Sequence, residues 1–162
     1  MAGSPDLQLA VGSDERTDLT DQVLADLRQR GYQLELAGPL AGDELAWPAV
    51  ARQVAEAVTN GRAHEGLLFC WTGTGVSLAA NKVPGIRAAL CADAETARGA
   101  RRWNNANVLC LSLRLTSPVV AKEILEAWFT TSYQPNSDDD ACLLAVDQLE
   151  ADYLRRPQPS AS

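Results

Sequence analysis

Short apolar runs alternate with longer segments of helical periodicity along this chain of 162 residues. Apolar runs of four to six residues that end in turn residues are typical of strands buried on both faces of a parallel sheet. Five strands are predicted on this basis, at Leu7–Val11, Tyr32–Leu36, Gly66–Phe69, Ile86–Cys91 and Val108–Leu111. Helices are predicted between and after them, at 19–30, 48–59, 94–103, 117–129 and 137–154, with a further small-residue helix directly after the third strand.

Residues at the segment ends agree with these boundaries. Gly31 follows the first helical segment, and Asn60-Gly61 follows the second, as is common at helix C-termini. Ser117-Pro118 supplies an N-cap serine with proline at the first helical position. Strands and helices alternate without a hairpin signal. This predicts an α/β fold, a Rossmann-like three-layer αβα sandwich with a five-stranded parallel sheet and a C-terminal helix. We expect one domain over residues 7–154, a disordered lead-in over 1–6 and a flexible tail over 155–162.

The charge balance narrows the class of partner. A formal net charge of -7 opposes nucleic acid or an anionic membrane as the main partner, because both require a basic face. A small metabolite is favoured instead, and no apolar run approaches the ~18 residues of a membrane span. The N-terminus is polar and does not resemble a signal peptide, so the cytoplasm is the expected location.

The four cysteines are widely spaced, form no CxxC pair and are accompanied by a single histidine, His64. A metal site is therefore not predicted. Cys91 and Cys110 lie within apolar runs and are interpreted as small buried residues. Cys70 differs, because it ends the third strand and a turn rich in glycine and threonine follows it.

This turn, Cys70–Gly75, is the strongest candidate for chemistry. Its two glycines suggest part of a dinucleotide fingerprint, but the third glycine would fall at Leu78 and the fingerprint normally follows the first strand, so NAD binding is not predicted. A thiol beside a helix N-terminus favours the thiolate form and can abstract a proton next to a carbonyl. Thr72 adds a hydroxyl, and the N–H groups of Gly73 to Val76 can hold the resulting oxyanion. Spacing alone leaves a second interpretation open, in which Cys70 packs and the glycines only make a tight turn.

The chain resembles the ribose-5-phosphate isomerase B and galactose-6-phosphate isomerase family from about Leu7 to Phe129. The blocks that carry the resemblance are Gly12–Asp14, Cys70–Ser77, Ala79–Cys91 and Asn104–Leu109. Members of that family interconvert aldose and ketose phosphates without metal or cofactor, so the resemblance implies no cofactor here. It also implies a homodimer, or a dimer of dimers, with active sites shared between subunits.

The resemblance assigns roles to individual residues. Cys70 would be the base that moves a proton between adjacent carbons, and Thr72 with the N–H groups of the loop Gly73–Gly75, Thr74 included, would stabilise the enediolate. Asp14 would bind the sugar or help to open its ring. Asn104 would reach the site from a neighbouring subunit.

Several positions depart from the family pattern. Glu15 replaces a usual histidine, Trp103 replaces the ring-opening histidine, Trp71 replaces a glycine, and Trp47 lies where the family has a tyrosine. An acidic stretch, 136–140, lies where relatives carry phosphate-binding arginines. Of the family's phosphate-binding arginines, this chain keeps only the one at Arg114. The predicted substrate-binding residues are Glu15, Trp47, Trp71, Gly73, Thr74, Gly75, Asn81, Trp103, Asn104 and Arg114.

These departures replace basic side chains by neutral or acidic ones, and a carboxylate near the site disfavours binding of a phosphate dianion. We therefore predict a sugar or sugar derivative that lacks the usual phosphate, with tryptophans that suit stacking on a sugar face. A second interpretation of the same pattern stays open, in which the tryptophans fill space left by smaller neighbours and the acidic stretch is a solvated helix cap. A different class of function is a non-catalytic sugar-binding or regulatory subunit with the same fold.

Overall fold

The computed structural model describes residues 7–155, and the predictions for residues 1–6 and 156–162 lie outside this part. Its five strands form one sheet in the order β2-β1-β3-β5-β4, and all four strand pairings are parallel. The strands are β1 (Gln8–Ser13), β2 (Gln33–Ala37), β3 (Glu65–Cys70), β4 (Ala88–Leu90) and β5 (Val108–Ser112). The predicted five-stranded parallel sheet is therefore confirmed.

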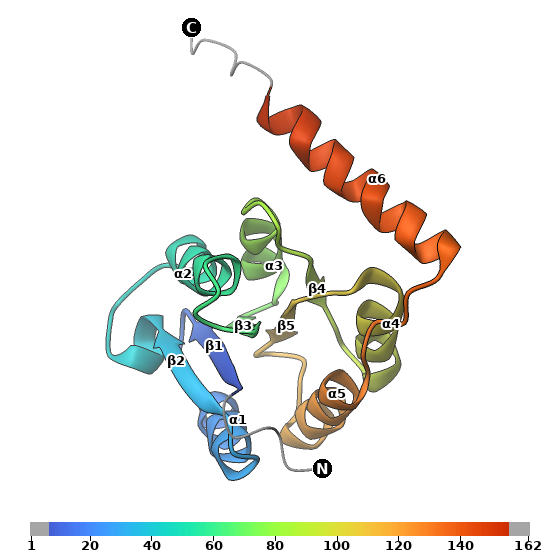
Figure 1. The fold of residues 1–162 in the computed structure, drawn as a ribbon. Coiled ribbons are helices and arrows are strands. Elements are labelled where there is room, and N and C mark those ends of the chain that lie inside the picture. The colour runs from blue at the N-terminus through green and yellow to red at the C-terminus, as the bar shows by residue number, and fades with distance from the viewer. Residues whose placement is uncertain (1–6, 156–162) are drawn as a thin grey trace, which may run out of the picture.

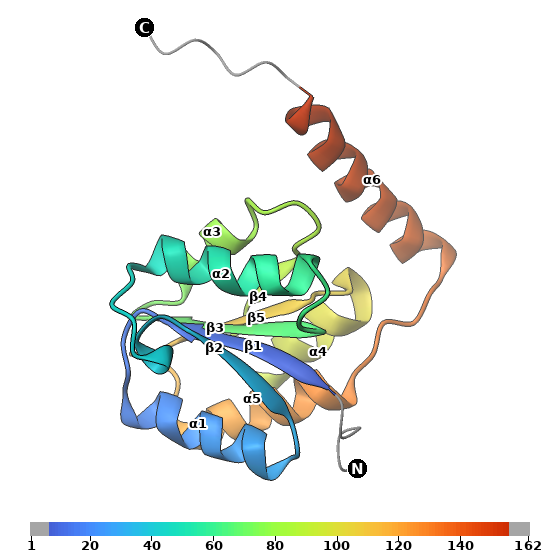
Figure 2. The ribbon, with the colours of Figure 1, turned by 60° about the vertical axis from the view of Figure 1, so that its left-hand side comes forward.

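Helices cover both faces of the sheet (Figures 1 and 2). The helices are α1 (Asp18–Gln29), the 3₁₀ helix η1 (Gly38–Ala41), α2 (Trp47–Thr59), α3 (Thr74–Ala80), α4 (Ala94–Asn104), α5 (Pro118–Thr130) and α6 (Ser137–Leu154). Helices α2 and α3 lie on one face, whereas α1, α4 and α5 lie on the other. Each face has its own apolar core: Phe69 and Trp128 belong to one cluster, and Val50 and Leu68 to the other. This is the expected three-layer sandwich.

The strand order positions the site. The chain runs from β1 outward to β2, then returns to place β3 on the other side of β1. In doubly wound sheets, such a reversal leaves a crevice at the carboxyl ends of the two central strands, and ligands bind there. The carboxyl ends of β1 and β3 are Ser13 and Cys70, so the fold directs attention to the loops that follow these two residues.

Local sequence explains most element boundaries. Ser117 is the N-cap of α5 and accepts a hydrogen bond from the Val120 N–H, and Gly31 ends α1 with a positive φ of 91°. The predicted strand at 86–91 is shorter in the structure, because the side-chain oxygen of Asn107 takes the Arg87 N–H before β4 begins. The residue that caps α6 is Asn136, while the three aspartates occupy the first turn.

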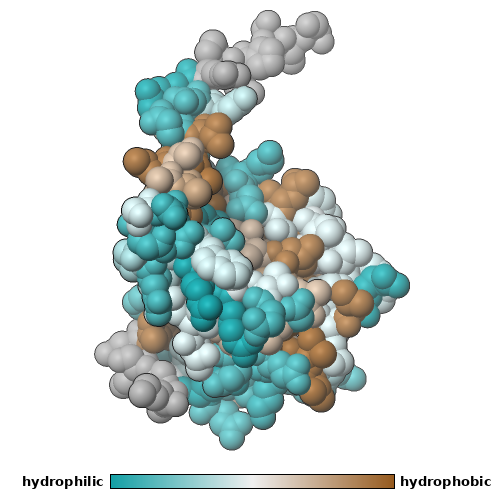
Figure 3. All heavy atoms as spheres, turned by 90° about the vertical axis from the view of Figure 1, so that its right-hand side faces the viewer, coloured by the Kyte–Doolittle hydropathy of each residue, from teal (hydrophilic) through white to brown (hydrophobic). Residues whose placement is uncertain are grey.

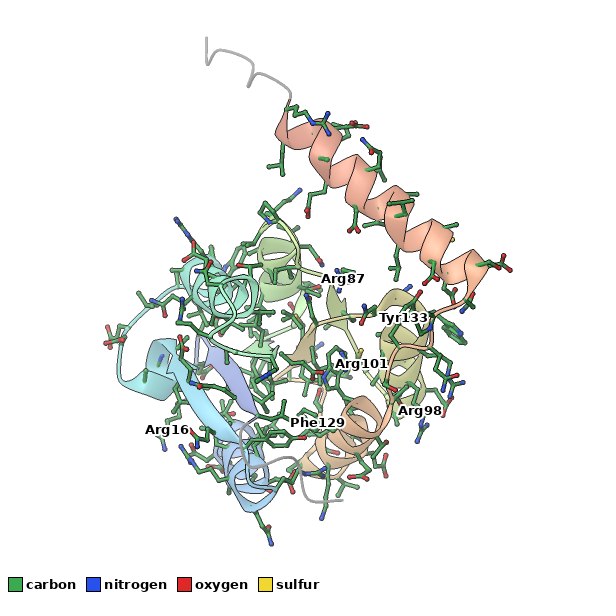
Figure 4. The ribbon with its side chains drawn as sticks, in the orientation of Figure 1. Arg16, Arg87, Arg98, Arg101, Phe129 and Tyr133 are labelled. Atoms are coloured by element: carbon green, nitrogen blue, oxygen red, sulfur yellow. The ribbon has the colours of Figure 1, made fainter. Side chains whose placement is uncertain are left out.

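A buried charge network holds the amino end of β3 to the helices on one face. A carboxylate oxygen of Glu65 lies 2.6 Å from an Arg101 guanidinium nitrogen, and the Trp128 indole N–H donates to the other oxygen at 2.6 Å. The Arg101 guanidinium also lies over the Trp128 ring. Figure 4 shows Arg101 directed into the body, whereas Arg98 of the same helix points outward. Burial outweighs the two favourable partners and raises the pKa of the Glu65 carboxyl.

Helix α6 extends away from the sandwich (Figure 1). None of its 18 residues is buried. Its contact with the body includes Glu150, whose carboxylate accepts the Gly85 N–H at 3.1 Å. Within residues 7–155, no helix combines the length and apolar character that crossing a membrane requires.

Candidate active site

Cys70 occupies the carboxyl end of the central strand β3 and is 5% exposed. Its neighbours at this edge are fixed by sheet register: Ser13 of β1 pairs with Phe69, and Ser112 of β5 pairs with Cys70. The loops after β1, β3 and β5 therefore meet at one edge of the sheet. The other two strand-associated thiols stay protonated, because burial raises the pKa of Cys110 and raises that of Cys91 to about 12.

The turn after Cys70 is held by its carbonyl groups. The Cys70 carbonyl accepts from the N–H groups of Gly73 at 3.2 Å and Leu113 at 3.0 Å. The Trp71 carbonyl accepts from the Arg114 N–H at 3.1 Å. The loop after β5 thus fastens the turn from one side. No side-chain acceptor pairs with the Arg114 guanidinium in the described part of the chain, and this side chain is exposed.

Gly73 allows the chain to turn into α3. Its φ is +76°, and an added Cβ would lie 2.6 Å from a Leu90 methyl and 3.0 Å from the Leu111 backbone. Residues 74–76 begin α3, so their N–H groups have no partner inside the helix, and residues 7–155 offer them no other acceptor. Thr72 and Thr74 place their hydroxyl oxygens 2.7 Å apart beside these donors. The turn therefore combines a thiol, a hydroxyl pair and free backbone donors.

An acidic hollow adjoins this edge after β1. Asp14 is partly buried, and desolvation, with a smaller contribution from the charge of Glu15, raises its pKa. The one cation here, Arg16, is bonded to Asp21 at 2.8 Å. The hollow has a volume of about 460 Å³ and is lined by Asp14, Glu15, Arg16, Pro39, Glu44, Leu45 and Ala46.

Trp47 connects this hollow to the turn. It is the first residue of α2, follows Ala46 of the hollow, and is 39% exposed. A Cβ added at Gly75 would lie 3.1 Å from the Trp47 indole, so glycine lets the ring rest on the start of α3. The structure thus brings together Asp14, Glu15, Trp47 and the residues of the Cys70 turn.

Trp103 and Asn104 lie at the other edge of the sheet. They are the last residues of α4, which begins after the carboxyl end of β4 and returns to the amino end of β5. Eleven helical residues span about 16 Å, so neither side chain reaches Cys70 of the same chain. The Trp103 ring packs against Gly99 and is 55% exposed.

Asn81 also lies away from the turn, at the C-cap of α3. Its amide donates to the Ala88 carbonyl at 2.9 Å and accepts the Ala88 N–H at 2.8 Å. These bonds close the loop before β4, and both ends of the Asn81 side-chain amide are used in them. Its role as a sugar ligand stays a prediction.

The acidic stretch forms the N-cap and the first turn of α6. The Asn136 side-chain oxygen accepts the N–H groups of Asp138 and Asp139, and Asp140 accepts the Tyr133 hydroxyl at 2.6 Å. These contacts favour the helix-cap interpretation of the stretch within one chain.

Sequence reasoning missed two residues at this edge. Ser112 ends β5 and bonds the Cys70 turn, and a polar residue directly after the apolar run 108–111 was the signal for it. Glu44 adds a third carboxylate to the acidic hollow, but it lies in a loop whose course the sequence did not indicate.

A doubly wound sheet with a thiol and free N–H donors at its strand reversal is the arrangement of an α/β enzyme. The family model described as ribose/galactose isomerase matches residues 9–142. The D-erythrulose-4-phosphate isomerase of Pectobacterium atrosepticum is 38% identical over 130 residues, which cover 79% of this chain and 86% of that protein. Ribose-5-phosphate isomerase B of Escherichia coli is 37% identical over 116 residues, covering 72% and 78%.

Solved structures agree with this result. Clostridium thermocellum ribose-5-phosphate isomerase B superposes with a TM-score of 0.84 at 32% identity, covering 91% of this chain and 99% of that one. The chain belongs to the ribose/galactose isomerase family. It is a sugar isomerase by that membership, and the resemblance found in the sequence is confirmed.

Proposed function

We propose that the protein is a cofactor-independent aldose–ketose isomerase, or an epimerase, in which Cys70 is the base and an enediolate is the intermediate. The observation that carries this proposal is the Cys70 turn, in which a thiol at the end of β3 is followed directly by backbone donors that have no acceptor among the described residues. Proton abstraction next to a carbonyl needs both parts, a base for the carbon-bound proton and donors for the developing oxyanion.

Each group has one task in this mechanism. The Cys70 thiolate removes the proton from the carbon beside the carbonyl and returns it to the neighbouring carbon. The Thr72 hydroxyl and the N–H groups of residues 74–76 hold the enediolate oxygen as negative charge develops, because the Gly73 N–H is already bonded to the Cys70 carbonyl. Asp14, whose pKa is raised by burial, retains its proton to higher pH than an exposed aspartate and can supply it to a ring oxygen during ring opening.

The charges around the turn favour a substrate without phosphate. Asp14, Glu15 and Glu44 line the hollow, and the only cation there is paired within its own helix region. Arg114 is a cation beside the turn, since its N–H bonds the Trp71 carbonyl. A phosphate dianion placed in the hollow would meet the carboxylates of Glu15 and Glu44, whereas sugar hydroxyls can donate hydrogen bonds to them.

The site is completed by a second copy of the chain in this proposal. Trp103 and Asn104 are both exposed and too far from Cys70 of their own chain, yet family resemblance assigns Asn104 to the site. A homodimer, alone or paired into a dimer of dimers, would bring them to the neighbouring turn. The free thiols of all four cysteines suit a reducing compartment, so we retain the cytoplasm as the proposed location.

The surface that fits a second copy is a groove of about 830 Å³ between α6 and the body. Its α6 wall, which we call the α6 stripe, consists of Leu143, Val146, Leu149, Tyr153 and Leu154, and Figure 3 shows apolar residues gathered on this part of the surface. Asn104 lines the opposite wall. An 18-residue helix with no buried residue lacks the packing that usually stabilises helices in proteins, and a second copy can provide it.

A pair of α6 variants tests the dimer. Leu149→Glu puts a charge into the stripe, where the leucine is 58% exposed. Leu144→Glu puts a charge on a leucine outside the groove that is somewhat more exposed, at 69%. Light scattering coupled to size exclusion should give about twice the 17.4 kDa chain mass, or four times for a dimer of dimers, for the wild type and Leu144→Glu, and a smaller assembly for Leu149→Glu. A wild-type monomer, or a dimer unaffected by Leu149→Glu, contradicts the proposal.

The second candidate function is a non-catalytic sugar-binding subunit. One observation favours it: the position that holds a ring-opening histidine in the resemblance is here Trp103, which has no acid–base group. Loss of an acid–base group lowers the rate by about 10²–10⁴-fold. A substrate that is already in open-chain form needs no ring opening and would not suffer this loss.

Proton NMR in heavy water separates these functions. The purified protein and a Cys70→Ser variant are incubated with D-ribose and D-erythrulose, and in parallel with ribose 5-phosphate and D-erythrulose 4-phosphate. Deuterium entering next to the carbonyl, and lost in the variant, supports the isomerase. Exchange with only the phosphorylated sugars overturns the proposal of a phosphate-free substrate. Binding without exchange of any sugar favours the non-catalytic subunit.

A further inference from the structure

Ser112 is a buried serine at the end of β5 whose hydroxyl bridges two loops. It is 5% exposed and pairs in register with Cys70. Its Oγ donates to the Trp71 carbonyl at 3.0 Å and accepts the Leu115 N–H at 3.2 Å. One side chain therefore contacts both the turn after β3 and the loop after β5.

The Trp71 carbonyl receives a second bond from the Arg114 N–H at 3.1 Å. With both bonds made, this carbonyl faces the loop after β5. The peptide planes that follow lead into the unbonded N–H groups at the start of α3. The orientation of the Trp71–Thr72 peptide thus bears on where those donors point.

We propose that Ser112 is a positioning residue, which fixes the Trp71–Thr72 peptide of the Cys70 turn and holds the Arg114 loop in register with it. This inference rests on the proposed function, because it assigns Ser112 to the reaction of the Cys70 turn. It also gives the exposed Trp71 side chain, at 60% exposure, a fixed base.

A merely structural serine would behave differently from this one. Ser117, five residues further on, also bonds a backbone N–H through its hydroxyl, as the N-cap of α5 at 3.2 Å from Val120 N. It contacts no part of the Cys70 turn among the bonds of the described chain. Ser117→Ala is therefore a matched control that removes a serine hydroxyl from the same loop region.

The test compares Ser112→Ala, Ser117→Ala and Ser112→Thr, the last of which keeps the hydroxyl. Displacement of reacting groups by a fraction of an ångström should lower kcat about tenfold in Ser112→Ala while KM changes less than twofold. Ser117→Ala should keep the wild-type kcat, and Ser112→Thr should recover most of it. Equal kcat in the two alanine variants, after thermal melts show both folded, overturns the proposal.

A second readout needs no substrate. Iodoacetamide labelling, resolved by peptide mass spectrometry, gives the alkylation rate of Cys70 relative to the exposed Cys142 of the same molecule. Ser112→Ala should change this ratio at least threefold, and Ser117→Ala should not. An unchanged ratio in Ser112→Ala counts against positioning even if no sugar is turned over, whereas failure of the isomerase itself appears as absent exchange in the wild type.

Discussion

Gly73→Ala is the substitution whose cost the structure defines most closely. Gly73 has φ of +76°, a conformation that costs an L-residue about 1–2 kcal/mol. An alanine Cβ would also lie 2.6 Å from a Leu90 methyl and 3.0 Å from the Leu111 carbonyl carbon. The Leu90 side chain can move aside, but the Leu111 backbone belongs to β5 and cannot. Overpacking of this kind adds about 1–3 kcal/mol.

Gly61→Ala is the matched control. Gly61 has nearly the same φ, +75°, but no atom lies within 4 Å of an added Cβ. We expect the free energy of unfolding to fall by about 1–2 kcal/mol in Gly61→Ala and by about 2–5 kcal/mol in Gly73→Ala. The difference between the two isolates the crowding at the Cys70 turn.

Urea unfolding followed by circular dichroism measures both values at one protein concentration. The m-value should be the same in both variants, so that the midpoint alone reports stability. Equal losses in the two variants would refute the reasoning, because backbone conformation would then account for the whole effect. The Gly73→Ala protein should also show weaker deuterium exchange than Gly61→Ala in the sugar assay.

Three further predictions concern the buried network and a helix cap. Glu65→Ala should lower the free energy of unfolding by about 3 kcal/mol, because the loss leaves the largely buried Arg101 guanidinium without its carboxylate partner. The pKa of Glu65 is raised in the folded state, so protonation of this carboxyl favours folding. The stability advantage of the wild type over Glu65→Gln, measured by urea titration, should therefore be greatest below pH 4.5 and should shrink as pH rises through the folded pKa. An advantage that grows with pH would contradict this. Thr17→Ala should cost about 1 kcal/mol in thermal melts, because Thr17 and Thr20 form a reciprocal capping box at the start of α1.

Much of the fold was predictable because the signals are local. Alternating apolar runs and helical segments need no distant partner to be recognised, and Ser117-Pro118 and Gly31 mark helix ends through their own backbone preferences. The shortened β4 could not be read this way, since it begins only after Asn107, some twenty residues later in the chain, has taken the Arg87 N–H. Local pattern predicts that a strand exists, whereas its length depends on its neighbours.

The candidate site also has a part that the local sequence predicts and a part that depends on distant residues. The sequence by itself determined the Cys70 turn, because strand, thiol, glycines and threonines are consecutive and their chemistry follows from their types. Only the tertiary structure decided which other residues share that edge: parallel register brings Ser112 to Cys70, while the return path of α4 carries Trp103 and Asn104 to the opposite edge. Distance across a sheet is set by strand pairing and helix direction, and neither is encoded at the position of the residue concerned.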